Sequence, residues 1–218
     1  MRKWTLCAAC SALFLIGCTS GPGAYYPLEK GREWKYETTA QFKGAAPIKF
    51  EVTSFVMEKR TLQGREVVPV RSEIQGSTSF LFYGSDESGV YLVARQEATD
   101  PEPVAQPISY LVKAPVAKGT TWKSSLALRP GETPVVVECV VVGDDAAVST
   151  DAGNFKNALQ ISCKGNVQQF GAQDTLVETH IWFVRGVGNV KNETLMTMNR
   201  IGAPPEFTIT TVLESFKR

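Results

Sequence analysis

Histidine most often carries acid–base or metal chemistry near neutral pH, and this sequence contains a single one, His180. It stands in an alternating segment in which Glu178 and Trp182 share its face. One histidine does not make a usual zinc site without cysteines or carboxylates from elsewhere. No G-x-S-x-G nucleophile elbow is present. We expect His180 to be a strand residue satisfied by a neighbour, with a catalytic role on envelope substrates as the alternative.

Acidic and glycine-rich segments offer no further site. The pairs at 86–87 and 144–145, with Asp151, lack the ligand spacing of a calcium loop and are typical of turns. The glycines at 186–188 are not followed by Gly-Lys-Ser/Thr, so they do not indicate a phosphate loop. The sequence therefore predicts no metal site, no cofactor and no catalytic residue.

The strongest chemical signal lies at the start of the chain. Arg2 and Lys3 form a short basic region, and residues 4–16 are almost entirely apolar. That run has the length of a signal-peptide core and is shorter than the roughly 20 residues that span a bilayer. It ends in Leu15-Ile16-Gly17-Cys18.

This tetrapeptide resembles the lipobox of bacterial lipoproteins. The resemblance implies that residues 1–17 are a signal peptide and that Cys18 becomes the N-terminus and carries diacylglycerol and palmitate. Thr19 replaces the aspartate that often retains such proteins in the inner membrane, which favours the outer membrane, facing the periplasm. An ordinary secretory signal or an uncleaved anchor is the alternative. No later apolar stretch reaches spanning length, so we expect the lipid to be the membrane attachment.

The remaining cysteines are expected to pair. Cys7 and Cys10 leave with the signal peptide, so Cys139 and Cys163 remain in an oxidising compartment. A hairpin that brings these two together centres on the turn residues 151–153, and both lie on the apolar face of their strands. We expect them to face each other, either as a disulfide or as two buried free thiols.

Charge argues against nucleic acid as a partner. The chain has 23 basic and 22 acidic residues, and removal of Arg2 and Lys3 leaves 21 against 22, a net charge of −1. Proteins that bind phosphate backbones usually carry a basic excess. The 43% hydrophobic and 10% aromatic content suits a packed core rather than a disordered tail.

Alternation of apolar and polar residues runs through the mature chain, with turn residues between the segments. The clearest segments begin near Ile48, Val135, Leu159, His180 and Phe207. We see no amphipathic helix after the signal peptide. The pattern predicts an all-β fold, a curved antiparallel sheet, half-barrel or barrel, with few or no helices.

A nine-residue motif occurs twice, at 27–35 and 115–123. The shared positions include Pro27, Gly31 and Trp34 in the first copy and Pro115, Gly119 and Trp122 in the second. Glycine supplies a turn, and the tryptophan is predicted to be the first inward side chain of the next strand rather than a ligand-stacking residue.

The repeat divides the chain. We expect a lipidated tether at 18–26 and a β domain at 27–218, built from halves at about 27–95 and 113–218. The connector at 98–114 contains three prolines and is expected to be extended and mostly irregular.

The mature chain also resembles a loose, poorly characterised family of bacterial lipoproteins and periplasmic β-domains. The resemblance rests on a PLxxGxxWxY segment, a turn of the type AGNF and a late GVGxVK segment, at Pro27–Tyr36, Ala152–Phe155 and Gly186–Lys191. It implies fold and location more than activity.

These observations predict a non-enzymatic envelope lipoprotein whose β domain binds a protein partner or an apolar ligand close to the membrane. An interior cavity lined by inward apolar side chains would favour the ligand. A fully packed interior would favour a protein partner. The rival hypothesis, an enzyme, needs His180 in a cleft beside an acidic or hydroxyl group.

Cys18→Ser tests the anchor. Because serine cannot form the thioether, metabolic labelling with a palmitate analogue should fall to background. Cys10→Ser is the matched control, because it alters a cysteine inside the predicted signal peptide and should keep the label. Full labelling of Cys18→Ser would contradict lipidation at this residue.

Overall fold

In the computed structural model, residues 21–126, 135–169, 173–198 and 206–218 are described. They contain one short 3-10 helix, η1 (Pro22–Ala24), and thirteen strands. The strands are β1 (Glu33–Phe42), β2 (Ile48–Val56), β3 (Arg60–Leu62), β4 (Arg65–Ile74), β5 (Ser77–Asp86), β6 (Gly89–Glu97), β7 (Val104–Lys113), β8 (Thr121–Leu126), β9 (Val135–Thr150), β10 (Gly153–Gln169), β11 (Gln173–Val184), β12 (Gly188–Met198) and β13 (Glu206–Lys217).

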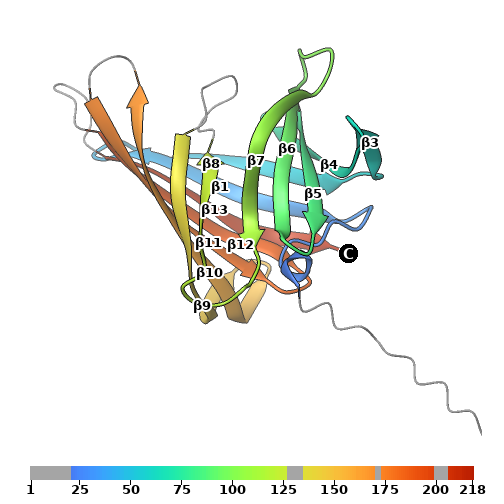
Figure 1. Ribbon diagram of the computed structural model, residues 1–218. Coiled ribbons are helices and arrows are strands. Elements are labelled where there is room, and N and C mark those ends of the chain that lie inside the picture. The colour runs from blue at the N-terminus through green and yellow to red at the C-terminus, as the bar shows by residue number, and fades with distance from the viewer. Residues whose placement is uncertain (1–20, 127–134, 170–172, 199–205) are drawn as a thin grey trace, which may run out of the picture.

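All of these strands belong to one antiparallel sheet that curls into a nearly closed barrel (Figure 1). Its order is β7-β6-β5-β4-β2-β1-β13-β12-β11-β10-β9-β8, with β3 paired only to β4. Each half of the chain is thus a six-strand meander, and β1 pairs with β13 where the halves meet. The predicted all-β, barrel-like fold is confirmed. Curling brings the two edge strands together, which limits unpaired edges.

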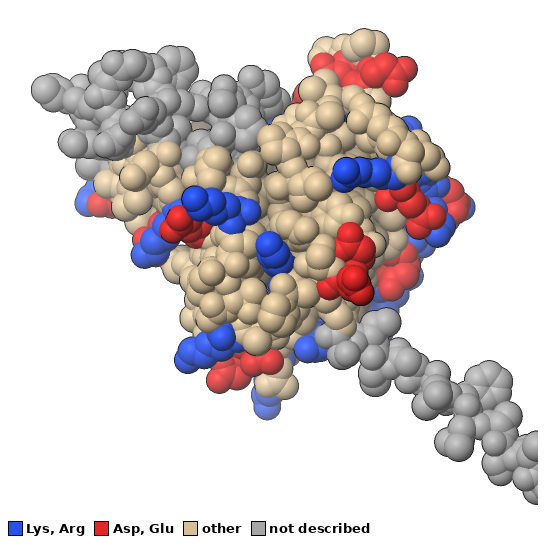
Figure 2. Space-filling model, viewed as in Figure 1, with Lys and Arg blue, Asp and Glu red and all other residues tan. Residues whose placement is uncertain are grey.

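The outer surface carries charges of both signs. On the face drawn in Figure 2, Lys and Arg are interspersed with Asp and Glu, and no large area has one sign. Several charges of the barrel pair across neighbouring strands, such as Lys49 with Glu37 and Lys164 with Glu178. None of the described segments forms an apolar helix of membrane-spanning length.

The N-terminal segment closes one end of the barrel, here called the lower end, where the β9–β10 turn also lies (Figure 1). Tyr25 is buried, and the amide of Gly186 in the β11–β12 turn donates to the carbonyl of Ala24 at 2.7 Å. Residues 21–26 therefore pack on the barrel instead of forming part of a free tether. The segment expected to be a tether, 18–26, is therefore packed on the barrel from residue 21 onward, because Tyr25 is buried and Tyr26 packs against the core.

Tyr26 fills this lower end from within. Its ring stacks on Trp34 at 5.5 Å between centroids and contacts Tyr83 at 5.3 Å. Burial raises the pKa of Tyr26 to about 12, although a hydrogen bond with Tyr83 opposes the shift. Burial also raises the pKa of Tyr36 and Tyr83 well above the ordinary value. These phenols stay neutral at physiological pH and serve as core side chains.

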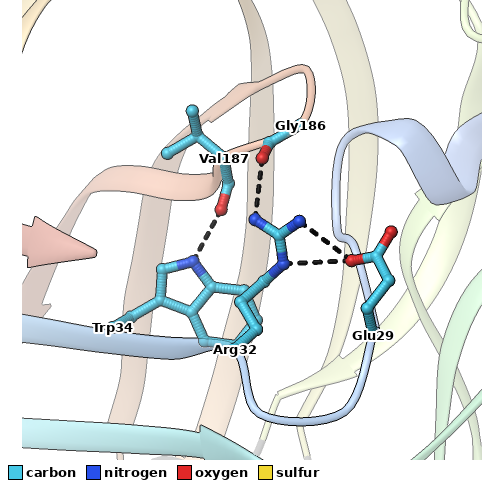
Figure 3. A network of polar contacts seen from close by, with 5 residues as sticks. All are labelled: Glu29, Arg32, Trp34, Gly186 and Val187. Atoms are coloured by element: carbon cyan, nitrogen blue, oxygen red, sulfur yellow. Dashed lines mark hydrogen bonds and ion pairs between the residues drawn. The ribbon is translucent and has the colours of Figure 1, made fainter. Parts of the chain in front are cut away.

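The first motif copy holds the β11–β12 turn in place (Figure 3). Trp34, 1% exposed, donates its indole N–H to the carbonyl of Val187 at 2.6 Å. The buried Arg32 donates to the carbonyl of Gly186 at 2.8 Å and pairs with Glu29 at 2.9 Å. The PLxxGxxW and GVGxVK segments, far apart in sequence, thus form one polar network. Buried donors such as the Trp34 indole require partners, and the backbone carbonyls of the turn supply them.

The two motif copies occupy equivalent positions. Gly31 and Gly119 adopt φ of +86° and +88°, which favours glycine. The amide of Gly31 donates to Val56 on β2, and the amide of Gly119 donates to Val141 on β9, each at 2.9 Å. Trp122, like Trp34, is the second residue of its strand and is buried.

The expectation that the connector at 98–114 is mostly irregular is wrong, because residues 104–113 form β7. Pro107 lies in this strand at a register irregularity between Ala105 and Ser109. β7 is an edge strand that pairs only with β6. A proline is tolerated at an edge and at a bulge, where no ladder hydrogen bond is lost.

Trp34→Phe should lower the free energy of unfolding by about 1–3 kcal/mol, because it leaves the buried carbonyl of Val187 without its donor. Trp122→Phe is the matched control. It should cost less, because the carbonyl of Tyr110 that accepts from Trp122 also accepts from Ser124. Urea denaturation of both variants measures the difference. Equal losses would contradict the role assigned to the Trp34 hydrogen bond.

Candidate functional site

The upper half of the barrel, away from η1, encloses a cavity of about 350 Å³. Nine strands contribute to its lining, and Ile74, 38% exposed, marks the level at which it meets solvent. Its apolar wall comprises Val52, Ile74, Leu81, Leu92, Leu111, Val137, Ile181 and the Cys139–Cys163 pair; its polar groups are Ser72, Ser79, Arg95, Gln106, Ser109, Ser124, Ser125 and Thr179, with Tyr110 completing the wall.

The lower half is filled, and the two halves of the interior differ in chemistry. Large buried side chains, among them Trp34, Tyr36 and Leu213, occupy the lower half. Above them, hydroxyl groups meet in cross-strand pairs. The described residues contain four: Thr38–Thr211 at 3.0 Å, Ser54–Ser72 at 3.2 Å, Ser109–Ser124 at 2.6 Å and Thr179–Thr194 at 3.0 Å. Hydroxyls that satisfy one another line a wall without leaving unpaired polar groups.

Side chains, rather than a backbone ladder, join the barrel where β7 meets β8. The hydroxyl of Ser109 on β7 accepts from the amide of Ser125 at 3.1 Å. Its single proton faces two acceptors, the carbonyl of Ser125 at 2.8 Å and the hydroxyl of Ser124 at 2.6 Å. The carbonyl of Tyr110 accepts from the indole of Trp122 at 3.2 Å and from Ser124 at 3.1 Å. We call this contact the β7–β8 seam.

The second junction between the halves, β1 with β13, is closed by backbone hydrogen bonds. β1 pairs with β13 over its whole length, from Glu33 opposite Lys217 to Phe42 opposite Phe207. In both junctions the first strand of one half meets the last strand of the other. The seam is therefore the weaker of two equivalent closures, and four of its residues, Ser109, Tyr110, Ser124 and Ser125, line the cavity.

Cys139 and Cys163 lie directly opposite each other on β9 and β10, as the hairpin centred on residue 151 predicts. They are joined by a disulfide and line the cavity wall. Register irregularities interrupt this hairpin between Phe155 and Ile161, and Asn157 adopts φ of +59° there. The bulges shift the register by a residue near the turn without separating the cysteines.

His180 lies on β11 facing outward, between Thr179 and Ile181, which line the cavity. Its Nε2 is 3.2 Å from the carboxylate of Glu178, which also pairs with Lys164 at 2.9 Å. Lys164 is the largest influence that lowers the pKa of Glu178. The histidine is thus part of a surface charge cluster and is absent from the cavity lining.

The other predicted residues are placed as follows. Trp34 and Trp122 are core side chains and do not line the cavity. No cluster of three or more metal-ligating side chains occurs within the described ranges. Residues 1–17 and Cys18, the predicted signal peptide and lipidation site, lie outside the described residues.

Sequence reasoning missed Arg95 as a cavity residue. Val90 and Leu92 point inward on β6, so strict alternation predicts that Arg95 points outward. The structure has an extra residue at Val93, since Tyr83 pairs with Leu92 and Phe82 with Ala94. This bulge reverses the alternation and carries Arg95 into the cavity. No local signal in the sequence marks such a bulge.

No protein-family model matches this chain, and no curated protein matches it. Two solved structures are similar. A protein of Bacteroides fragilis, described as exported and as having a YmcC-like fold, is 13% identical with a TM-score of 0.43 over 89% of this chain and 99% of that one. A protein of Parabacteroides distasonis, described as a lipoprotein, is 12% identical with a TM-score of 0.46 over 88% and 98%.

Ser109→Ala should loosen the seam, because it removes the acceptor for the amide of Ser125. Hydrogen exchange of that amide, followed by NMR, should become about tenfold faster, the equivalent of one lost hydrogen bond. Ser54→Ala is the control, since its pair with Ser72 spans two strands that already share a ladder. Unchanged protection of Ser125 in Ser109→Ala would contradict the seam.

Proposed function

We propose that this chain is a non-enzymatic, membrane-anchored envelope lipoprotein whose barrel binds an apolar ligand in its upper cavity. The cavity carries the proposal. Its volume of about 350 Å³ falls within the range of small-molecule sites, and its wall is mainly apolar with a few polar groups. A scaffold that served only as a rigid interaction module would not need an unfilled interior, since close packing stabilises a fold.

The anchor part of the proposal rests on the lipobox at Cys18, and the packing of the next residues gives the barrel an orientation. Gly21 begins the segment packed on the lower end, and the three residues from Cys18 to Gly21 span at most about 11 Å. The lower end would therefore lie against the lipid surface. We propose that this surface is the outer membrane. The cavity would open away from it into the periplasm.

The surroundings of His180 favour a binding protein over an enzyme. Its imidazole pairs with the half-buried carboxylate of Glu178, and the cavity lining contains neither this histidine nor an acidic residue. General acid–base catalysis needs titratable groups that converge on one bound substrate.

Binding of the neutral apolar dye N-phenyl-1-naphthylamine tests the ligand site. Dye fluorescence should rise and saturate with the wild-type protein. Leu81→Trp enlarges a lining side chain and should weaken dye binding about tenfold or more. Val142→Trp is the control, because it adds the same side chain at an exposed position of β9 and should not change the affinity.

Thermal melts of both variants would establish that they fold. Absence of saturable dye binding by the wild type would refute the ligand site. Equal affinities of the wild type and a folded Leu81→Trp would place the dye elsewhere and refute it too.

A further inference from the structure

The cavity lining contains one charged side chain, Arg95 on β6. Its side chain is only 21% exposed. Gln106, Ser79 and Ser125 also belong to the lining near the upper strand ends. A guanidinium beside a mainly apolar wall loses much of its hydration, which is costly unless partners compensate.

Within the described residues, Glu97 satisfies only part of the hydrogen-bonding capacity of Arg95. Its Nε donates to the carboxylate of Glu97, two residues further along β6. Glu97 does not itself line the cavity. A guanidinium has five N–H donors, and within the described part of the chain its two terminal amino groups form no further hydrogen bond. They are suited to a planar anionic acceptor such as a carboxylate or phosphate.

The part of the lining nearer the lower strand ends is mainly apolar. Leu92 and Leu111 lie nearer the lower strand ends than Arg95 and Gln106, and the Cys139–Cys163 disulfide adds to the apolar wall from β9 and β10. The cavity is therefore amphipathic, with a cationic, hydrogen-bonding mouth and an apolar interior. Its volume of about 350 Å³ is at the small end for ligand sites, which suits one hydrocarbon chain better than two.

From this arrangement we propose that the ligand is a single-chain amphiphile with an anionic head, and that Arg95 is the residue that selects the head. The chain occupies the apolar interior, and the head accepts hydrogen bonds from the terminal amino groups of Arg95. This inference rests on the proposed function, which it deepens by naming the class of ligand.

The test compares laurate with dodecanol, which have the same chain length and differ in charge at the head. Arg95→Met keeps an unbranched stem and removes the donors, so it should weaken laurate binding about ten- to hundredfold while changing dodecanol binding little. Arg95→Lys keeps the charge and should give an intermediate loss. Titration calorimetry measures each affinity, and dodecyl phosphate in parallel shows whether the natural head is more like a carboxylate or a phosphate.

Arg71→Met is the matched control. Arg71 also pairs with a glutamate two residues along its strand, Glu73 at 3.2 Å, but it alternates with Ser72 and so faces outward from β4. Its side chain is 43% exposed. This variant should bind laurate as the wild type does.

Equal laurate affinities for a folded Arg95→Met and the wild type would overturn the assignment of Arg95. Wild-type protein that binds the neutral dye but neither laurate nor dodecanol would overturn the ligand class while leaving the proposed function intact. Wild-type protein that binds none of the three would refute both.

Discussion

Closure of the sheet depends on how the backbone groups along β7 and β8 are satisfied, because these strands are the two ends of an otherwise continuous ladder. Ser109, Trp122 and Ser124 supply side-chain donors and acceptors in place of strand pairing. The barrel therefore closes without a complete ladder at this position. Ser109 and Ser124 also line the cavity, so the closure shapes part of its wall.

The lower end of the barrel is held by a different set of contacts. Trp34 and Arg32 bind the carbonyls of the β11–β12 turn, while Tyr25 and Tyr26 fill the space beneath. This end is consequently packed, whereas the cavity lies toward the upper end. On the proposed lipidation of Cys18, the packed end would lie against the membrane and the cavity would open away from it.

The cavity combines two requirements that conflict in a simple core. Apolar side chains stabilise the barrel by burial, whereas Arg95 and the cross-strand hydroxyl pairs need polar partners. Pairing each hydroxyl with another, and Arg95 with Glu97, keeps these groups tolerable in the absence of ligand. On the proposed ligand class, a bound anionic head would add hydrogen bonds to this network without rearranging it, as in a preformed site.

Local patterns in the sequence determined most of the strands, the antiparallel class, the Cys139–Cys163 alignment and the burial of both motif tryptophans. These follow from a period of two and from turn residues, which act over a few neighbours. Only the tertiary structure decided that Arg95 faces inward, that residues 104–113 form a strand, and that side chains close the seam. Each of these depends on how the strands are arranged. A bulge is defined by the register of the neighbouring strand, a proline is tolerated at the edge of a sheet, and the two edges meet only once the sheet has curled.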